Sequence, residues 1–458
     1  MDKYYGMIIV GAGITGSALA YVASRYSNIK DILILEKYGK IAPLNSDSTN
    51  NSQTLHFGDI ETNYTVEEAA HTKEAAERVI SYTSALSAAE RERIISPVQK
   101  MVLGVGDEEI AHLGKIYDSG IKKLFPGLKE IGPKGLEKIE PMVIKGRPKE
   151  QKVTALLSDK GFMVNFGLLA RSFSEKAIKS KSARIQIKFN CPAISVHPVE
   201  DGHEVITSKG TFKARFVVFA AGTYSLYFAK HLGYDQNLSI LSVGGGFYIA
   251  PRVLRGKVYR VQAGGVPFAA IHGDPDITNK AITRFGPTVS FPLSLEVRER
   301  GSTVDYLRTF DFDIPTIESL FNIISNKDIR RIMRRNMIYP LPIIGKHLFI
   351  KNEVSLIVPS LDPSKIYFDK NVGGIRPQII DENKRFLTLG ASKIRGNNIM
   401  FNITPSPGAT SSLQSAIDDI IYISEILDKK FDVQKCEREL GKIDYEHLKY
   451  KISQHKQI

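Results

Sequence analysis

A glycine motif near the N-terminus constrains the fold more than any other stretch of the chain. Residues 7–10 (MIIV) predict a short buried strand, and the GAGITG that follows has the spacing G-x-G-x-x-G. A helix-compatible stretch, SALAYVASRY, comes next, and a second apolar run at 32–35 (ILIL) ends at Glu36, 20 residues after Gly16. Strand, glycine turn, helix, strand and terminal acid in this order predict a dinucleotide-binding α/β unit.

Each part of this motif has a physical reason. Gly11 permits the tight turn, Gly13 lets the backbone approach a pyrophosphate, and Gly16 lets the helix pack closely on the strand. The helix N-terminus offers free N–H groups and a positive dipole end to the phosphates, and Glu36 can accept hydrogen bonds from a ribose diol. The motif alone does not separate FAD from NAD.

Composition narrows the class of protein. The chain has 458 residues, enough for two or three domain-sized units, and at 43% hydrophobic and 24% charged it is typical of a globular protein. Its two cysteines, Cys191 and Cys436, give no disulfide framework, zinc spacing or redox pair, which favours a reducing compartment. No apolar run approaches the roughly 18–20 residues of a membrane span. We expect no signal peptide and no metal site.

The alternation of helix-like and strand-like segments along the chain predicts the domain organisation. We expect an α/β fold, with a Rossmann-like doubly wound sheet and an inserted, mostly antiparallel substrate domain. Residues 1–100, 155–235 and 366–430 are assigned to the dinucleotide-binding domain. Residues 101–154 and 236–365 are assigned to the substrate domain, because glycine-containing, strand-like runs predominate from about 235 to 365. Residues 431–458 are expected to be a charged tail.

Two other stretches suit a dinucleotide. An apolar strand expected at 212–219 runs into AAGTYS, whose Ala221 and Gly222 leave room for a close approach. Residues 408–410 (GAT) precede a helical pattern and place a second helix N-terminus where a negatively charged or electron-rich group could bind. Ordinary turns would explain either stretch taken alone.

The polar stretch NNSQTLHFGDIETNYT, residues 50–65, has no convincing helical or strand period. It lies shortly after the second strand of the predicted dinucleotide unit. A surface loop is one interpretation, and a loop that covers a cofactor is the other, because polar side chains are expected where a segment faces a ligand.

These segments together carry a family resemblance. GAGITG with Glu36, NNSQTLHFGDIETNYT, AAGTYS, PFAAIHGDPD with RFGPT, GGIRPQIID and NITPSPGATSS occur in the order found in malate:quinone oxidoreductases. The chain resembles that family from about residue 5 to 430, and L-2-hydroxyglutarate dehydrogenase is a near relative on the same D-amino-acid-oxidase-like fold. The N-x-S-Q-T-x-H…N-Y-T and H-G-D-P-D patterns are the more discriminating ones.

The resemblance implies an FAD enzyme that oxidises (S)-malate to oxaloacetate and passes electrons to a membrane quinone. It also implies a cytoplasmic location, peripheral on the inner face of the cell membrane. L-2-hydroxyglutarate oxidation, oxygen as the acceptor, a nicotinamide-linked dehydrogenase and a non-catalytic flavin protein remain alternatives. The candidate cofactor-binding residues are those of the matched motifs: Gly11, Ala12, Gly13, Ile14, Thr15, Gly16, Glu36, Lys37, Ser52, Gln53, Thr54, Ala221, Gly222, Gly374, Gly408, Ala409 and Thr410.

Malate oxidation needs a base for the hydroxyl proton and cations for two carboxylates. Histidine suits the base, because its pKa of roughly 6.5 is close to working pH. His272 is the first candidate, since Asp274 follows closely and could orient its ring; His56 in the polar stretch is the second. Arginine suits carboxylates because its planar fork can bind both oxygens. Arg376 and Arg284 are the preferred cations, and Lys393 and Arg395 are weaker candidates.

Charge distribution bears on the partners. The net charge of +13 fits nucleic acid, an anionic membrane surface or acidic substrates. Nucleic acid is the least favoured, because the chain has no zinc finger, RNA-binding aromatic signature or basic tail. Residues 319–351 contain seven Lys/Arg and one Asp among apolar residues, which suits a segment that lies on anionic lipid. An internal helix with one solvated basic face is the alternative.

Overall fold

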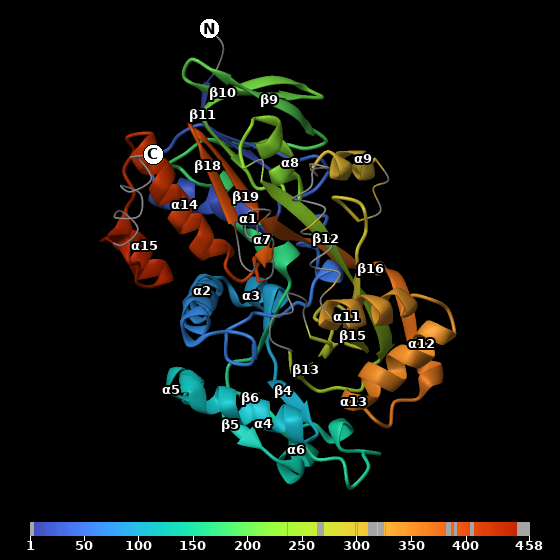
Figure 1. Ribbon diagram of the computed structural model, residues 1–458. Helices are drawn as coiled ribbons and strands as arrows, with labels where there is room; N and C mark the ends of the chain where they lie inside the picture. The colour runs from blue at the N-terminus through green and yellow to red at the C-terminus, as the bar shows by residue number, and fades with distance from the viewer. Residues whose placement is uncertain are drawn as a thin grey trace.

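The computed structural model describes residues 4–235, 237–262, 270–297, 299, 301–309, 318, 325, 327–381, 386–388, 392–403 and 407–446. Two large sheets organise this part of the chain (Figure 1). The hairpin β9–β10 lies at one end of the molecule, and α4, α5 and α6 lie at the opposite end (Figure 1).

The first sheet is the predicted dinucleotide-binding sheet. Its main strand order is β18 (Ser392–Gly396), β19 (Ile399–Ile403), β11 (Gly210–Phe219), β1 (Tyr4–Val10), β2 (Ile32–Leu35) and β8 (Ile185–Lys188). The pairs from β19 to β8 are parallel, and β18 is antiparallel to β19. A parallel sheet is buried on both faces, which explains why MIIV and ILIL are continuous apolar runs rather than alternating ones.

Different elements cover the two faces of this sheet. Met7 and Ile9 join a core with helices α1 (Ile14–Tyr26), α7 (Phe166–Ile178) and α14 (Ser412–Ile426). Ile8 and Val10 join a second core with α8 (Tyr224–His231) and with the hairpin of β9 (Ala193–Val199) and β10 (Gly202–Thr207). The predicted α/β fold class is therefore confirmed, although a hairpin and one short helix take the place of a second helical layer.

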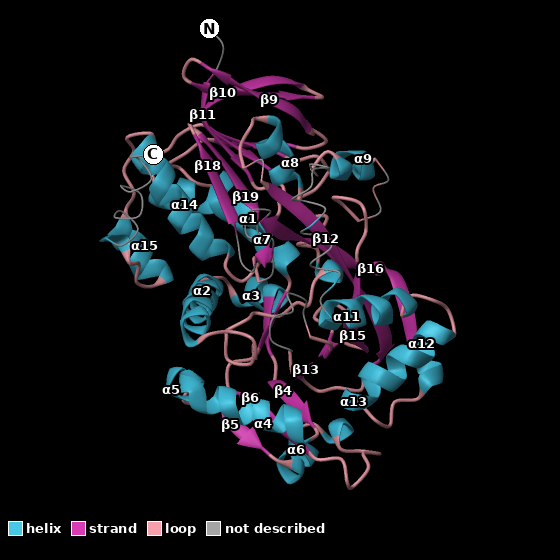
Figure 2. Ribbon diagram, in the orientation of Figure 1, coloured by secondary structure: helices cyan, strands magenta, loops and turns pink. Residues whose placement is uncertain are grey.

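The second sheet is mostly antiparallel, as expected of the substrate domain. Its order is β17 (Phe386–Thr388), β16 (Tyr367–Asp381), β12 (Leu238–Pro251), β15 (Ile282–Ser290), β14 (His272–Pro275), β13 (Lys257–Arg260), β4 (Lys100–Val105), β6 (Val153–Ser158) and β5 (Lys129–Ile131). Only the pair β13–β4 is parallel among these strands. The long strands β12 and β16 lie side by side over most of their lengths (Figure 2).

The remaining elements surround this framework. A small sheet pairs β3 (Ile95–Pro97) with β7 (Phe162–Val164). The other helices are α2 (Val66–Ser84), α3 (Ala88–Ile94), α4 (Asp107–Ile116), α5 (Lys122–Leu124), α6 (Pro133–Ile139), α9 (Ser302–Leu307), α11 (Lys327–Ile338), α12 (Ile344–Phe349), α13 (Ser355–Ile357) and α15 (Val433–Leu440). None of the helices in the described ranges is long and apolar enough to cross a membrane.

The course of the chain differs from the expected boundaries in two places. Residues 367–381, assigned from sequence to the dinucleotide-binding unit, form β16 of the second sheet, and only the strands from 392 onward return to the first sheet. Residues 433–440, assigned to a charged tail, form α15, which buries Cys436 and Leu440 against the first core. Residues 447–458 lie outside the described residues.

Candidate active site and its cofactor cavity

A cavity of about 500 Å³ opens at the carboxyl ends of the central strands of the first sheet. The ends of β1, β2 and β11 all contribute to its wall, which is where open α/β sheets bind ligands. The volume lies within the range of pockets that hold drug-sized molecules. This cavity is therefore the candidate site for the cofactor and the substrate.

The glycine motif shapes one wall of the cavity as its spacing predicts. Gly11 has φ +106°, and a Cβ there would lie 2.5 Å from the carbonyl oxygen of Ala220. A Cβ on Gly16 would lie 1.9 Å from the carbonyl oxygen of Gly11, so only glycine lets α1 pack this close to β1. Gly13 borders the cavity, and the nearest atom to a Cβ there is the Ser46 hydroxyl oxygen at 3.5 Å.

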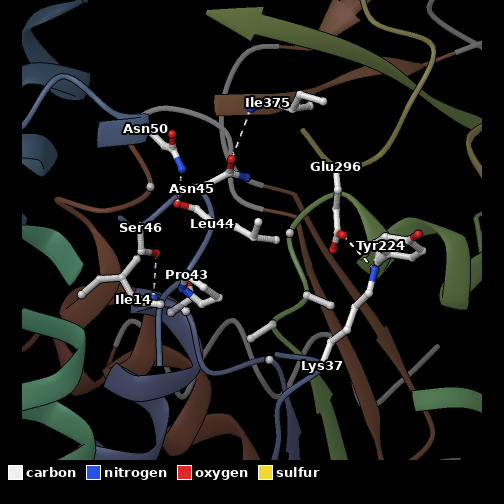
Figure 3. Close-up of a pocket in the computed structure, with 18 of the residues that line it drawn as sticks. Ile14, Lys37, Pro43, Leu44, Asn45, Ser46, Asn50, Tyr224, Glu296 and Ile375 are labelled. Atoms are coloured by element: carbon white, nitrogen blue, oxygen red, sulfur yellow. Dashed lines mark hydrogen bonds and ion pairs between the residues drawn. The ribbon is translucent and has the colours of Figure 1, made fainter. Parts of the chain in front are cut away.

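Glu36 holds the motif together as well as lining the cavity. Its two carboxylate oxygens accept hydrogen bonds from the backbone N–H of Ala12 (2.8 Å) and of Tyr38 (2.9 Å). Burial raises the pKa of the Glu36 carboxyl, and these N–H donors oppose that rise. At the start of α1, the N–H of Ile14 donates to the Ser46 hydroxyl (3.0 Å), which brings the loop after β2 over the helix N-terminus (Figure 3).

The polar stretch from residue 50 is not a surface loop. Its apolar side chains Leu55, Phe57 and Ile60 are buried in the first core, while Asn50, Asn51 and Ser52 line the cavity. Thr54 and His56 line it too. The stretch therefore packs its apolar residues inward and turns several of its polar residues toward the cavity.

Buried cations of the second sheet hold the backbone of this loop. Arg284 on β15 donates to the carbonyl oxygens of Ser48 (3.2 Å) and Asn51 (3.0 Å), and Lys257 on β13 donates to that of Ser52 (2.8 Å). Charged donors make strong hydrogen bonds to carbonyl groups that would otherwise be left without a partner. The loop is thus fixed by residues more than 200 positions away in the sequence.

Gln53 does not line the cavity but anchors the same loop. Its side-chain amide donates to Ser48 O and Asp276 Oδ2, both at 2.9 Å, and its carbonyl oxygen accepts from the N–H of Ile277 at 2.8 Å. Gln53 also has φ +55°, a backbone conformation that non-glycine residues adopt rarely. The predicted flavin contact of Gln53 is therefore replaced by a structural role toward the second sheet.

His56 and Glu61 form a histidine–carboxylate pair on the wall of the cavity. The imidazole Nδ1 lies 2.6 Å from a Glu61 carboxylate oxygen. Burial would raise the pKa of the Glu61 carboxyl, but the His56 contact outweighs burial and lowers it. The backbone N–H of His56 donates to the Thr410 hydroxyl (3.2 Å), which joins this loop to the segment before α14.

Arg376 on β16 also lines the cavity. Burial lowers the pKa of its guanidinium, and no carboxylate within the described ranges forms an ion pair with it. Arg376 is partly buried, and a guanidinium withdrawn from bulk water normally requires a hydrogen-bonded counter-charge. The two residues before Arg376 hold β16 against the loop. A Cβ on Gly374 would lie 2.6 Å from Asn50 O. The N–H of Ile375 donates to Asn45 Oδ1 at 3.2 Å (Figure 3).

His272 forms another histidine–carboxylate pair, but away from the cavity wall. It is 2% exposed, and its Nδ1 lies 2.7 Å from Asp274 Oδ2, at ion-pair distance but without hydrogen-bond angles. The other Asp274 oxygen lies 3.2 Å from Lys257 Nζ. Burial would raise the pKa of Asp274, yet His272 and Lys257 lower it to about 2.

The burial of this cluster also affects its bases. Burial lowers the pKa of His272, against the opposing effect of Asp274, and it lowers the pKa of Lys257 to about 8. The Tyr259 ring stacks on His272 at 4.6 Å and its hydroxyl meets Thr54 Oγ1 at 2.5 Å, so this cluster lies directly behind the loop. His272 is placed where it can support the cavity wall rather than touch its contents.

The predicted site residues fall into two groups. Those that line the cavity are Gly11, Gly13, Ile14, Thr15, Glu36, Lys37, Ser52, Thr54, His56, Ala221, Gly222, Arg376, Gly408, Ala409 and Thr410. Those that support its wall or lie elsewhere are Ala12, Gly16, Gln53, His272, Arg284, Gly374, Lys393 and Arg395. Lys393 pairs with Asp419 at 2.6 Å, and the Arg395 guanidinium lies 4.5 Å over the Tyr422 ring.

The structure adds residues that the motifs did not indicate. Glu61 follows His56 by five positions, so the H-x-x-x-x-E spacing could have suggested the pair. Asn45, Glu296 and Asp305 also line the cavity, but they come from segments without a recognisable pattern, whereas Tyr224, which lines it too, lies in AAGTYS but was not itself singled out. Parts of two matched motifs, residues 267–269 of PFAAIHGDPD and 404–406 of NITPSPGATSS, lie outside the described residues.

Comparisons with solved structures agree with this architecture. The chain is similar to an L-α-glycerophosphate oxidase from Mycoplasma pneumoniae solved with FAD bound, with a TM-score of 0.62 and 16% identity over 96% of this chain and 98% of that one. A glycine oxidase from Geobacillus kaustophilus gives a TM-score of 0.61 and 14% identity over 93% of this chain and 95% of that one. At these identities the similarity shows the shared fold.

Sequence comparison gives the family. The chain is 37% identical to a malate:quinone oxidoreductase of Helicobacter pylori over 457 residues, which cover 98% of this chain and 100% of the relative. It is also 37% identical to a probable malate:quinone oxidoreductase of Campylobacter jejuni, over 96% of this chain and 99% of the relative. Residues 3–325 match the family described as malate:quinone oxidoreductase (Mqo). The expected resemblance is confirmed, and the chain belongs to the malate:quinone oxidoreductase family.

Proposed function

We propose that His56 and Arg376 carry out the family's reaction, the FAD-dependent oxidation of malate to oxaloacetate with a quinone as electron acceptor. The observation that carries this assignment is the Arg376 guanidinium, which forms no ion pair with a carboxylate of the described residues and lies in the same cavity as His56, whose Nδ1 is held by Glu61. A cation that lacks an internal counter-charge is suited to an anionic ligand.

The cavity fits FAD in its shape and in its donors. Gly11 and Gly16, where a Cβ would have no space, shape the turn that would hold the pyrophosphate. Glu36, Gly13 and Thr15 border the space for the ribose and phosphates. Ser52, Thr54 and residues 408–410 would meet the flavin half. When bound, FAD would supply the hydride acceptor for the oxidation of malate and the two-electron donor for the quinone.

His56 would take the hydroxyl proton of malate. With Nδ1 against Glu61, Nε2 is the nitrogen that can face the substrate, and Glu61 fixes the ring and stabilises its charged form after proton transfer. His272, the first candidate from sequence, would need to move from behind the loop to reach a ligand. We therefore assign the base to His56 and a supporting role to His272.

Arg376 would bind a carboxylate of malate. Its planar fork can donate two parallel hydrogen bonds, which fixes the orientation of the substrate as well as its position. Arg284, the other arginine predicted from sequence, already donates to two loop carbonyls and lies beside Asp276. We assign Arg284 to the support of the cavity wall.

An anaerobic spectrum of the purified protein tests this proposal. Malate should bleach the flavin absorbance within the enzyme's turnover time, and a quinone should restore it. 2-Hydroxyglutarate, one carbon longer, should bleach it far more slowly. Equal bleaching by the two acids would reject malate as the preferred substrate, and no bleaching by malate would reject the activity.

We also propose that the enzyme meets its quinone by lying on an anionic membrane surface. The support comes from the end of α11, the start of α12 and the turn between them, where Met337, Ile344 and Ile343 are 72%, 63% and 83% exposed. Arg331 and Arg334 are exposed on the preceding helix. Residues 319–324 and 326 of the expected membrane segment lie outside the described residues.

The backbone of this turn adds a second reason. Ile343 has φ +63° and ψ −71°, and the N–H of Ile344 donates to the carbonyl oxygen of Pro342 at 2.7 Å, which makes a strained γ-turn. A β-branched residue rarely adopts this conformation, and strain of this kind is found where function requires it. The turn presents apolar side chains between basic ones, as interfacial segments do.

Binding to liposomes tests the membrane proposal. The protein should sediment with vesicles that contain anionic lipid and much less with neutral ones, and high salt should weaken binding. Ile344→Asp should reduce binding, whereas Ile178→Asp, which changes an exposed isoleucine on α7, should not. Equal binding by the two variants would contradict the role of the turn.

A further inference from the structure

A segment between β15 and α11 forms part of the cavity wall that neither the motifs nor the family reaction explains. We call residues 294–297 and 301–309 the strap; the second part includes α9. Leu295 and Tyr306 of the strap are buried in the core that also contains α8, so the strap is packed onto the first sheet's side of the molecule. Glu296 and Asp305 both line the cavity.

The strap meets the end of β2 through one carboxylate. Glu296 Oε2 accepts a hydrogen bond from Lys37 Nζ at 2.8 Å (Figure 3). It also accepts one from the Tyr38 hydroxyl at 2.7 Å. Lys37 and Tyr38 directly follow Glu36 in the sequence. The Lys37 ammonium lies 5.2 Å over the ring of Tyr224, at the start of α8. The Glu296 side chain is 10% exposed and that of Lys37 is 36% exposed, so this ion pair is partly buried and is screened less than a pair between two fully exposed side chains.

Two further contacts tie the strap to α8. The Tyr224 hydroxyl donates to Asp305 Oδ2 at 3.0 Å, and the Thr223 hydroxyl donates to the carbonyl oxygen of Leu295 at 2.6 Å. The strap is therefore held from two sides, by the end of β2 and by the start of α8. Residues of both attachments, Lys37 and Tyr224, line the same cavity as Glu36.

The acid at the end of the second strand marks the ribose end of a bound dinucleotide. A dinucleotide whose ribose lies beside Glu36 would be enclosed between the first sheet and the strap. Carboxylates at this place suit the ribose hydroxyls and the adenine amino group, which are hydrogen-bond donors, and Lys37 compensates the charge of Glu296. We propose that the strap is a clasp that retains the adenosine half of FAD, with Lys37–Glu296 as its closing contact.

This inference rests on the assignment of the cavity to FAD but not on malate as the substrate. Release of the adenosine half would require the strap to open locally. The contacts of Glu296 would therefore break before any contact with FAD is lost. The rate of FAD release, rather than turnover, is therefore the quantity that the clasp controls.

The test measures FAD release from the holoenzyme by the rise of flavin fluorescence after dilution. Glu296→Gln should release FAD about 10-fold faster than the wild type, because it removes a hydrogen-bonded charge pair. Glu77→Gln is the matched control. Glu77 lies on α2 and forms an exposed ion pair with Lys160 (3.1 Å), so its loss should leave the rate of FAD release unchanged. Tyr38→Phe is a milder variant that removes one donor to Glu296 and should raise the rate about 3-fold.

A double-mutant cycle separates the clasp from direct FAD contacts. Lys37→Met should accelerate release, and the double variant Lys37→Met with Glu296→Gln should release FAD little faster than the faster single variant, because both changes remove one interaction. Additive effects, or an unchanged release rate in Glu296→Gln, would overturn the clasp. A wild-type protein that binds no FAD would overturn the cofactor assignment itself, whereas normal FAD release without malate oxidation would affect only the proposed reaction.

Discussion

The two histidine–carboxylate pairs of this enzyme have similar distances and very different surroundings. His56 and Glu61 are 2.6 Å apart on the cavity wall, and His272 and Asp274 are 2.7 Å apart behind the loop. The His272 pair has Lys257 as an additional buried cation, whereas the His56 pair has open space on its other side. Sequence spacing favours His272 as the catalytic histidine, because Asp274 is only two residues away.

The proposed assignment of His56 as the base and His272 as a supporting residue rests on this difference in access. A base must come within hydrogen-bond distance of the proton that it removes. The same ion pair in a closed environment can only hold neighbouring elements together, and here it backs the loop that carries His56. Three pairs of substitutions test this difference between the two histidines and their surroundings.

The largest effect is expected at the histidines. His56→Gln should lower the rate of flavin reduction by malate by about 10²–10⁴-fold, the usual contribution of a positioned base, with FAD still bound. His272→Gln should lower that rate by less than about 10-fold and should instead destabilise the protein by about 1–3 kcal/mol, because it leaves buried charges without a partner. Stopped-flow reduction and urea unfolding measure the two quantities. A greater loss of rate at His272 would reverse the assignment.

An intermediate effect is expected at the arginines. Arg376→Lys should raise the KM for malate about 10–100-fold, because a point charge cannot replace the planar fork. Arg284→Lys should leave KM within a few-fold and should lower the thermal midpoint, since Arg284 holds Ser48 and Asn51. Steady-state kinetics over a range of malate concentrations will show whether KM responds to Arg376 alone. Equal KM values for the two variants would remove Arg376 from substrate binding.

The smallest effect is expected at Glu61, which acts through His56. Glu61→Gln should lower the rate of flavin reduction about 10-fold, because Gln keeps a hydrogen-bond acceptor but loses the charge that stabilises protonated His56. Glu77→Gln on the surface of α2 serves as the control for loss of one carboxylate. An unchanged reduction rate in Glu61→Gln would show that His56 needs no carboxylate partner.

Acid stability gives an independent check on the same pair. The pKa of Glu61 in the folded protein lies below its usual value of 4.5, so the folded state binds fewer protons than the unfolded state. Glu61 therefore stabilises the fold above pH 4.5, and this contribution disappears as the pH falls through the folded pKa. The free energy of unfolding should fall less in Glu61→Gln than in the wild type between about pH 5 and 3. Identical pH dependence would contradict the lowered pKa.

Local rules were sufficient for much of the fold. The glycine motif, the two buried strands and α1 follow from steric requirements and from apolar runs that are close together in the sequence, so sequence predicted them within a few positions. The apolar run predicted at 32–35 forms strand β2 with the same limits, because a short, continuous apolar run is typical of a strand buried on both faces. Non-local pairing was less predictable: β16 joined the second sheet through its long ladder with β12, which no local pattern indicates.

The sequence by itself determined the family, the dinucleotide-binding unit and many of the residues from which the site is built, because these depend on residue type and spacing. Only the tertiary structure decided which of those residues face the cavity. His56 reaches it because Arg284 and Lys257, distant in sequence, hold the loop carbonyls, and those two buried cations in turn need Asp274, Asp276 and a closed environment around His272. Burial and counter-charge are properties of the assembled fold, so only the fold distinguishes the open surroundings of His56 from the closed surroundings of His272.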